Sequence, residues 1–225
     1  MIYFQAMNTN QVIYLLAVSL PGFLLGIVCH EAAHAYMAYR FGDPTAKSLG
    51  RLTLNPSVHY DLFGTIIFPI LGVIMGGWMF GWAKPVPIDT RRFKNIRSGI
   101  FWVSFAGPLA NLMIMVVAAF LYALLNTKVS PSFSYLGVFS AMLYHAIQIN
   151  VILAVFNLIP LPPLDGSKMV SSMLSYQASL KFEELQRYSF LIFLVLMVTP
   201  ILSYILTPAL VVAGFITNAF IYLLH

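Results

Sequence analysis

The sequence predicts an all-α polytopic membrane protein with about five to six transmembrane helices, one re-entrant element and a short membrane-associated β-strand or hairpin. Of its 225 residues, 60% are hydrophobic and only 8% are charged, and the mean hydropathy is +0.86. The apolar runs and their connectors take up nearly the whole chain, which excludes a sizeable soluble domain. We attribute the net charge of +5 to the Lys and Arg excess of cytoplasmic loops, so no nucleic-acid partner is expected.

The first predicted helix runs from about residue 11 to residue 40. Polar N-cap candidates precede it, and a Gly-Asp-Pro sequence follows it as a stop signal. Pro21 and Gly22 are expected to kink this helix. Residues 1–7 resemble a tag-cleavage scar or a disordered start and are left out of the fold prediction.

Two less regular segments follow the first helix. Residues 46–55 alternate weakly between apolar and polar side chains, so a short strand or hairpin is expected there. The next apolar run, residues 62–82, is interrupted by glycines and by Pro69. It is therefore either a poor spanning helix or a re-entrant hairpin.

The distribution of Lys and Arg favours the re-entrant alternative. If residues 62–82 span the membrane, the twelve Lys and Arg residues divide eight to four between the two sides. If these residues re-enter, the division becomes eleven to one, with Lys128 alone outside, which fits the positive-inside rule far better. We therefore expect five spanning helices, with the start of the first outside and the end of the last in the cytosol.

The rest of the chain contains four further apolar runs that are predicted to form membrane helices. They are residues 99–126, 135–159 and 188–206, and a shorter run, residues 208–224. A polar stretch precedes the third of these runs. It opens with three prolines, which are followed by Asp165 and Gly166.

His30, Glu31 and His34 form an H-E-x-x-H pattern inside the first predicted helix. Residues four apart on a helix lie on one face, so the two histidines can offer nitrogens to one metal ion while Glu31 flanks it. An ionisable group inside a membrane helix costs about 2.5–3.5 kcal/mol and is a functional candidate. The pattern is typical of zinc hydrolases. The alternative is that two buried histidines simply hydrogen-bond to neighbouring helices.

A catalytic zinc usually takes three protein ligands, and the pattern alone leaves the third one open. Asp165 is attractive because prolines stiffen the chain before it and Gly166 frees the chain after it. Cys29 is expected to point away from the two histidines. Three carboxylates are expected to lie on loops exposed to water: Asp43, Asp61 and Asp89. His59 and His145 are possible ligands, but we expect His59 to stabilise a loop or lie at the interface and His145 to make a helix-to-helix contact.

Three stretches taken together resemble the signature motifs of the site-2 protease family of intramembrane zinc metalloproteases. They are HEAAH at residues 30–34, GPLAN at residues 107–111 and NLIPLPPLDG at residues 157–166. The resemblance covers residues 20–175, approximately. H-E-x-x-H alone is moderately specific, whereas the ordered triple is strong.

The resemblance implies a role for each matching polar residue. One Zn²⁺ per chain would be held by three ligands, His30, His34 and Asp165. Glu31 would activate the attacking water. Asn157 would bind the substrate backbone or the developing oxyanion, and Asn111 would support the packing of the site.

We therefore expect residues 8–225 to form a single membrane protease domain, with a C-terminal helical hairpin at residues 187–224. The predicted enzyme is a zinc metalloendopeptidase that cleaves transmembrane segments in the lipid bilayer, in regulated intramembrane proteolysis. At 1.5 Å per residue, Glu31 lies about 13 Å deeper than Arg40, so the site is predicted to lie nearer the cytosolic face of the cell membrane. Oligomeric state is left open by the sequence.

Two further expectations concern access to the site. The substrate helix is expected to unwind locally and to pair with the predicted strand at residues 49–54. Asn150 and Asn157, seven residues apart on one helix face, are expected to admit water.

Two other functions are compatible with the motif. A metal-binding membrane transporter or scaffold would use the same ligands without peptidase activity. A zinc hydrolase of another membrane substrate, such as a prenylated-protein protease, would need a second acidic helix motif, which the sequence lacks.

Overall fold

The computed structural model describes residues 8–75, 79 and 81–225, and all regular structure among them is helical. The predicted scar at residues 1–7 lies outside the described residues. Four of the described helices are long and apolar enough to cross a membrane: α1 (Thr9–Phe41), α5 (Ile96–Lys128), α6 (Leu136–Asn157) and α10 (Ile201–Leu224). The predicted all-helical membrane fold is confirmed in this form, whereas the count of five to six spans is not.

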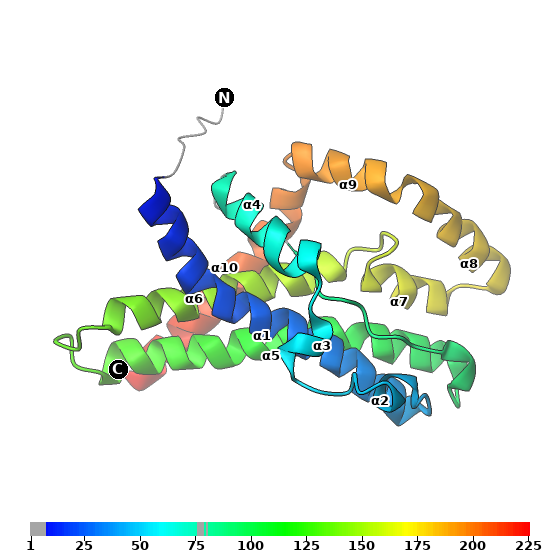
Figure 1. Ribbon diagram of the computed structural model, residues 1–225, viewed down its shortest axis with the longest axis horizontal. Helices are drawn as coiled ribbons and strands as arrows, with labels where there is room; N and C mark the ends of the chain where they lie inside the picture. The colour runs from blue at the N-terminus through cyan, green and yellow to red at the C-terminus, as the bar shows by residue number, and fades with distance from the viewer. Residues whose placement is uncertain (1–7, 76–78, 80) are drawn as a thin grey trace.

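The long helices α1, α5 and α6 form the centre of the molecule, and α10 packs on α5 and α6 (Figure 1). Gly22 of α1 lies against Ala146 of α6, and both helices run in the same direction from there. Helix α5 runs the opposite way, because Val103 in its second turn contacts His34 near the end of α1. The starts of α1 and α6 therefore share one end of the bundle with the end of α5.

Helix α10 brings the chain back to that same end. The rings of Phe120 near the end of α5 and Phe220 near the end of α10 lie 5.6 Å apart between centroids. Our prediction that the last helix ends opposite to the start of the first is therefore wrong. Four spans, an even number, return the chain to its starting side.

The predicted spans at residues 188–206 and 208–224 are divided differently in the structure. Helix α9 (Ser189–Val198) has ten residues, about 15 Å at 1.5 Å per residue, which is too short to span alone. The break falls at Pro200, because Thr199 before it takes an extended conformation (φ −96°, ψ 159°). Pro208 is accommodated inside α10, as prolines in membrane helices can be.

The segment that was expected to contain a strand forms tight turns instead. The Asp43 carboxylate accepts hydrogen bonds from the backbone and hydroxyl of Thr45, and this turn starts the short helix α2 (Thr45–Ser48). Bends follow, and then α3 (Pro56–His59); none of the described residues here is in a strand. Local turn chemistry outweighs the weak alternation of residues 46–55, so the expected strand or hairpin is absent from the described structure of this segment.

The glycine-interrupted run begins with η1 (Leu62–Ile67), a π-helical segment, and continues as α4 (Phe68–Ile74). Together they extend about 20 Å, less than the hydrocarbon core of about 30 Å, so they do not span it. This agrees with the expectation that the run does not cross. Part of the predicted re-entrant element, residues 76–78 and 80, lies outside the described residues.

The remaining short helices lie between the spans or precede α9. Between α4 and α5 lies η2 (Thr90–Arg92), and after α6 come α7 (Asp165–Met173), α8 (Tyr176–Glu183) and η3 (Glu184–Tyr188). In Figure 1 the segment from α8 to α9 forms an arch beside the central helices.

The connector before α5 is fastened along α1. The Asp43 carboxylate accepts a hydrogen bond from the Asp89 backbone N–H (2.7 Å), and Arg51 donates to the Lys84 carbonyl (2.8 Å). Asp43 is fully buried, so its carboxylate is a structural anchor. These bonds fasten the connector to the segment that follows α1.

Gly22 makes the close approach of α1 and α6 possible. A Cβ atom at this position would lie 2.6 Å from the Ala146 Cα, a backbone atom that cannot move away freely. We expect Gly22→Ala to destabilise the protein by about 1–3 kcal/mol, the usual cost of overpacking. Thermal unfolding in detergent would measure this, and Gly137→Ala, whose Cβ meets nothing within 4 Å, should unfold like the wild type.

Candidate metal centre

His30 and His34 lie one turn apart on α1, and their rings meet edge to face with centroids 4.6 Å apart. Their Nε2 atoms are 3.0 Å from each other. Both side chains are buried. The two imidazoles therefore present their Nε2 atoms to one point on the inner face of α1.

Asp165 reaches the same point from the first residue of α7. Its Oδ2 atom lies 3.1 Å from the Nε2 atoms of both His30 and His34. A Cβ atom at Gly166 would lie 2.2 Å from the Leu158 carbonyl oxygen. Glycine after Asp165 thus allows the start of α7 to fold back tightly onto the end of α6, which places the carboxylate at the histidines.

The surroundings of Asp165 favour the ionised form of its carboxyl group. Burial alone raises the pKa of this carboxyl, but the adjacent His34 and His30 rings and the Lys168 ammonium outweigh burial and hold the pKa well below its usual range. The Lys168 ammonium lies 3.1 Å from Oδ1, so Oδ2 is the oxygen that faces the histidines.

The second nitrogen of each ring is occupied by an oxygen that can only accept a hydrogen bond. His30 Nδ1 lies 2.7 Å from the Asn111 side-chain oxygen, and His34 Nδ1 lies 2.6 Å from the Val103 carbonyl. Nδ1 of each ring therefore faces an acceptor, which leaves Nε2 as the nitrogen that can bind a metal ion. Two imidazole Nε2 atoms and one carboxylate oxygen converge, and this donor set can hold a cation.

This donor set fits a zinc ion. Zinc takes histidine nitrogen and carboxylate oxygen at about 2.0–2.2 Å, so its tetrahedral ligands stand about 3.3 Å apart. The three ligand atoms are mutually 3.0–3.1 Å apart, within a few tenths of an ångström of that spacing. Among the described residues they are the group of at least three His, Cys, Asp or Glu side chains able to hold a metal ion.

Gly107 of α5 leaves room at the point where these atoms meet. A Cβ atom here would lie 2.5 Å from His34 Nε2 and 2.6 Å from His30 Nε2. Glycine is required at this position, because any side chain here would occupy the site itself.

Glu31 is directed toward the connector beside α1. Its Oε2 atom accepts a hydrogen bond of 2.8 Å from the Val86 backbone N–H. Pro85 and Pro87 have no N–H, so Val86 supplies the one amide donor among these three residues. The amide holds one carboxylate oxygen of Glu31, next in sequence to His30.

The other predicted residues are distributed as follows. Asn111 joins the centre through His30, whereas the Asn157 side chain donates to its own helix at the Leu153 carbonyl (2.9 Å). Asn150 is fully buried, so the expectation that it admits water is wrong. His59 stabilises its loop as predicted, through a bond of 2.9 Å to the Thr53 carbonyl.

The loop carboxylates and the other two singled-out residues lie elsewhere. Asp61 accepts from the Gly64 N–H (2.7 Å), Asp89 pairs with Arg91 (2.8 Å), and the ring of His145 lies against that of Tyr144. Cys29 is a free, partly buried thiol outside the ligand group. Sequence reasoning missed the Val86 N–H and the Val103 carbonyl, because backbone groups leave no mark in a motif. It also missed that Asn150 is buried.

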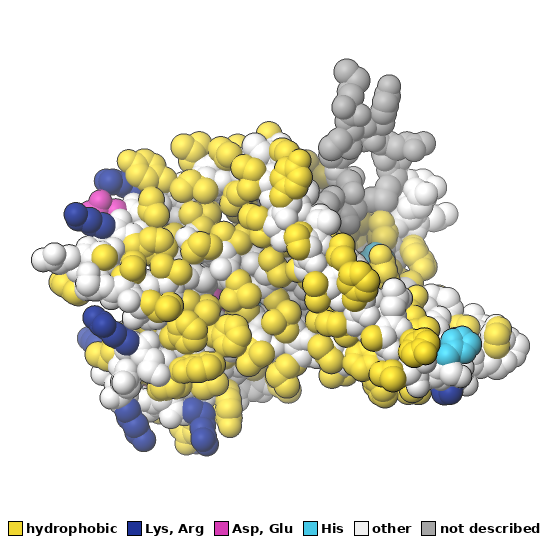
Figure 2. Space-filling model, turned by 180° about the vertical axis from the view of Figure 1, so that it is seen from behind, with side chains coloured by type: hydrophobic (Ala, Val, Ile, Leu, Met, Phe, Trp, Pro, Cys, Tyr) yellow, Lys and Arg dark blue, Asp and Glu magenta, His cyan; other side chains and the backbone are white. Residues whose placement is uncertain are grey.

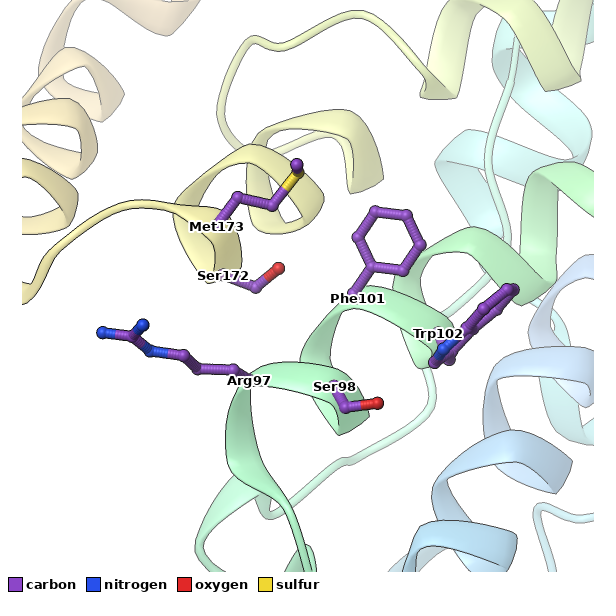
Figure 3. Close-up of a pocket in the computed structure, with 6 residues that line it drawn as sticks. All are labelled: Arg97, Ser98, Phe101, Trp102, Ser172 and Met173. Atoms are coloured by element: carbon purple, nitrogen blue, oxygen red, sulfur yellow. The ribbon is translucent and has the colours of Figure 1, made fainter.

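A cavity of about 260 Å³ lies apart from these ligands, between the first turns of α5 and the last turn of α7. Figure 3 shows Arg97 extending away from the hydroxyl groups of Ser98 and Ser172. The polar groups of this cavity do not point to a common centre, in contrast to those at His30.

Known proteins place the chain in a family. Residues 128–200 match the sequence pattern of Peptidase family M50. Over 191 residues, 83% of each chain, the protein is 42% identical to the "Putative zinc metalloprotease YwhC" of Bacillus subtilis. The chain belongs to peptidase family M50, the site-2 protease family.

A second relative supports the same assignment. The "Putative zinc metalloprotease Rip2" of Mycolicibacterium smegmatis is 32% identical over 184 residues, which cover 82% of this chain and 68% of Rip2. No solved structure matches the chain. This M50 protein is accordingly a multi-pass membrane metalloprotease with zinc as its cofactor.

Proposed function

We propose that this M50 protein is an intramembrane zinc endopeptidase that cuts transmembrane segments of other membrane proteins, in regulated intramembrane proteolysis. The convergence of Asp165 Oδ2 with His30 Nε2 and His34 Nε2, which belong to the apolar helix α1, supports this proposal most directly. In it, these three residues hold the zinc ion and Glu31 is the general base.

Residues around the proposed zinc site orient its ligands and transfer protons. Asn111 and Val103 hold the two rings so that both Nε2 lone pairs face the ion. When bound, the zinc ion supplies a Lewis acid that polarises a carbonyl and makes water a better nucleophile near neutral pH. Glu31 accepts the proton of that water and returns it to the leaving amine. The Val86 N–H orients the Glu31 carboxylate for this transfer.

Asn157 is proposed to contact the unwound substrate. It is partly buried, and one of its side-chain N–H groups already donates to the Leu153 carbonyl. The second N–H is available to a substrate carbonyl or to the oxyanion that develops on it. A helical substrate must unwind to offer its peptide bond, because its carbonyls are otherwise bonded within the helix.

Zinc content and cleavage of a panel of membrane-anchored reporters by the purified protein in lipid discs would test the function. We expect one zinc per chain, cleavage within the reporter's transmembrane segment, loss of both on chelation, and recovery on adding zinc. A protein that binds zinc, leaves every reporter intact and moves the metal across vesicle membranes would be a carrier, and the peptidase proposal would fail.

The site is proposed to lie nearer the cytosolic face of the cell membrane. Lys128 lies in the α5-to-α6 turn region, and the other eleven Lys and Arg residues belong to the connectors and helix ends at the opposite side of the bundle. Figure 2 shows most of the visible Lys and Arg side chains at one end of the molecule. The positive-inside rule assigns that end to the cytosol.

Labelling of single introduced cysteines would check this orientation. We expect a membrane-impermeant maleimide to label Ser132→Cys, in the exposed α5-to-α6 turn, in intact cells. Thr90→Cys, in the exposed η2 turn, should be labelled only after lysis. The reverse pattern would place the metal centre nearer the outer face.

A further inference from the structure

Two buried asparagines connect the three central helices to His30. Asn150 of α6 contacts Asn111 of α5, which contacts His30 of α1. Both asparagines are 0% exposed. The hydrogen bonds from Asn150 to Asn111 and from Asn111 to His30 are therefore made without competition from water.

The orientation of the Asn150 amide is fixed by backbone carbonyls. Its Nδ2 atom lies 3.2 Å from the Gly22 carbonyl and 2.9 Å from the Ala146 carbonyl. Both partners can only accept, so the nitrogen must face them and the side-chain oxygen must face Asn111. Gly26 is needed for this approach, since a Cβ there would lie 2.6 Å from Asn150 Oδ1.

The orientation of Asn111 follows from that of Asn150. Its Nδ2 atom donates to Asn150 Oδ1 (2.9 Å) and to the Gly26 carbonyl (3.1 Å), so both N–H groups are used. Its oxygen is left to face His30 Nδ1. A reversed Asn111 amide would demand the other tautomer of His30, whose Nε2–H would point at the ligand atoms and remove one lone pair.

We propose that Asn150 is a positioning residue for the metal centre, which acts through Asn111 to keep His30 in the tautomer that presents Nε2 to zinc. This inference rests on the proposed role of His30 as a zinc ligand. The Gly26 carbonyl still holds one Asn111 N–H without Asn150. The expected loss is therefore about tenfold in zinc affinity, the low end for groups that orient a ligand.

The test combines ring-nitrogen NMR with zinc titration. The chain has five histidines, so selective ¹⁵N-histidine labelling of the zinc-free protein gives few signals, and His30→Ala assigns the one of interest. Because Nδ1 faces the Asn111 oxygen, wild-type His30 should be protonated at Nδ1. In Asn150→Leu the His30 signal should shift toward a mixture of tautomers, and the zinc Kd should rise about tenfold.

Asn126→Leu is the matched control. Asn126 also connects α5 to α6, through Ser140 (3.1 Å), but at the far end of α5 from the metal centre. This variant should keep the wild-type tautomer and zinc affinity. If both variants lose thermal stability, the His30 tautomer and the zinc Kd still distinguish a positioning role of Asn150 from a role in packing alone.

Each result decides the inference without reference to cleavage. Unchanged tautomer and zinc affinity in Asn150→Leu would overturn it, even if the wild type cleaves reporters. If Asn150→Leu fails to fold, the wild type alone decides, because His30 protonated at Nε2 would overturn the proposal. If the wild type shows the expected tautomer and cuts no reporter, the positioning role stands and the peptidase function fails.

Discussion

Glu31→Gln is expected to lower the turnover of reporter cleavage by about 10²- to 10⁴-fold, the usual contribution of a general base, while zinc content stays at the wild-type value. The side-chain amide of this variant keeps an oxygen that can accept from the Val86 N–H as the Glu31 carboxylate does, so the connector should stay in place. An amide cannot take a proton from water at neutral pH. Turnover numbers measured alongside zinc per chain would separate loss of the base from loss of the metal.

The same variant separates the peptidase from a metal carrier. A carrier would keep its function in Glu31→Gln, because the ligand atoms of His30, His34 and Asp165 are untouched. Glu184→Gln is a suitable control, since the Glu184 side chain is 63% exposed and pairs only weakly with Arg187 at 3.5 Å. Wild-type cleavage by Glu31→Gln would assign the base to another group.

Gly107→Ala is expected to weaken zinc binding by roughly 100-fold, which corresponds to about 3 kcal/mol at the upper end of usual overpacking costs. The added methyl group would lie 2.5–2.6 Å from the Nε2 atoms of His34 and His30. The rings cannot turn aside without breaking the Nδ1 bonds to Asn111 and the Val103 carbonyl. Competition with a chelator of known affinity would measure the zinc Kd.

Gly214→Ala provides the control for this substitution, because a Cβ atom there meets nothing within 4 Å. It should bind zinc as the wild type does and unfold at the same temperature or slightly higher, since alanine favours a helix. Equal zinc affinity in Gly107→Ala and wild type would mean that α5 does not press on the ligand nitrogens. In the protein, α5 would then lie farther from His30 than the Gly107 distances indicate.

Helical periodicity was sufficient to predict the His30 and His34 pair, because the spacing of four alone places both on one face of α1. Asp165 is 135 residues from His30. The prolines and Gly166 around it made it an attractive third ligand, but only the family resemblance singled it out from the other candidates. The bend that delivers Asp165 depends on a backbone contact between Gly166 and Leu158, which no spacing rule contains.

Asn150 shows why polar residues in apolar helices are hard to interpret from sequence. The sequence around an asparagine does not show whether its side chain contacts water or is buried among backbone carbonyls. The difference lies in Gly22 and Gly26, whose carbonyls become accessible only because α1 lies so close to α5 and α6.

The helix count depended on two prolines with similar surroundings. Pro200 ends a helix, while Pro208 lies inside one. The predicted run 188–206 continued through Pro200 and the break was expected before Pro208, whereas a membrane helix can contain Pro208. Similarly, residues 46–55 do not form the predicted strand, because the turn made by Asp43 and Thr45 starts a short helix there.

Because Asp165 lies on the α6-to-α7 bend, a metal ion bound by His30, His34 and Asp165 would cross-link the first helix to a segment far along the chain. An ion held there closes a loop of more than half the sequence. Binding that is confined to the folded chain adds about 2.7 kcal/mol to its stability at a hundredfold excess of ion over Kd. Starving a cell of zinc would therefore make this protein easier to unfold and degrade, as well as inactive.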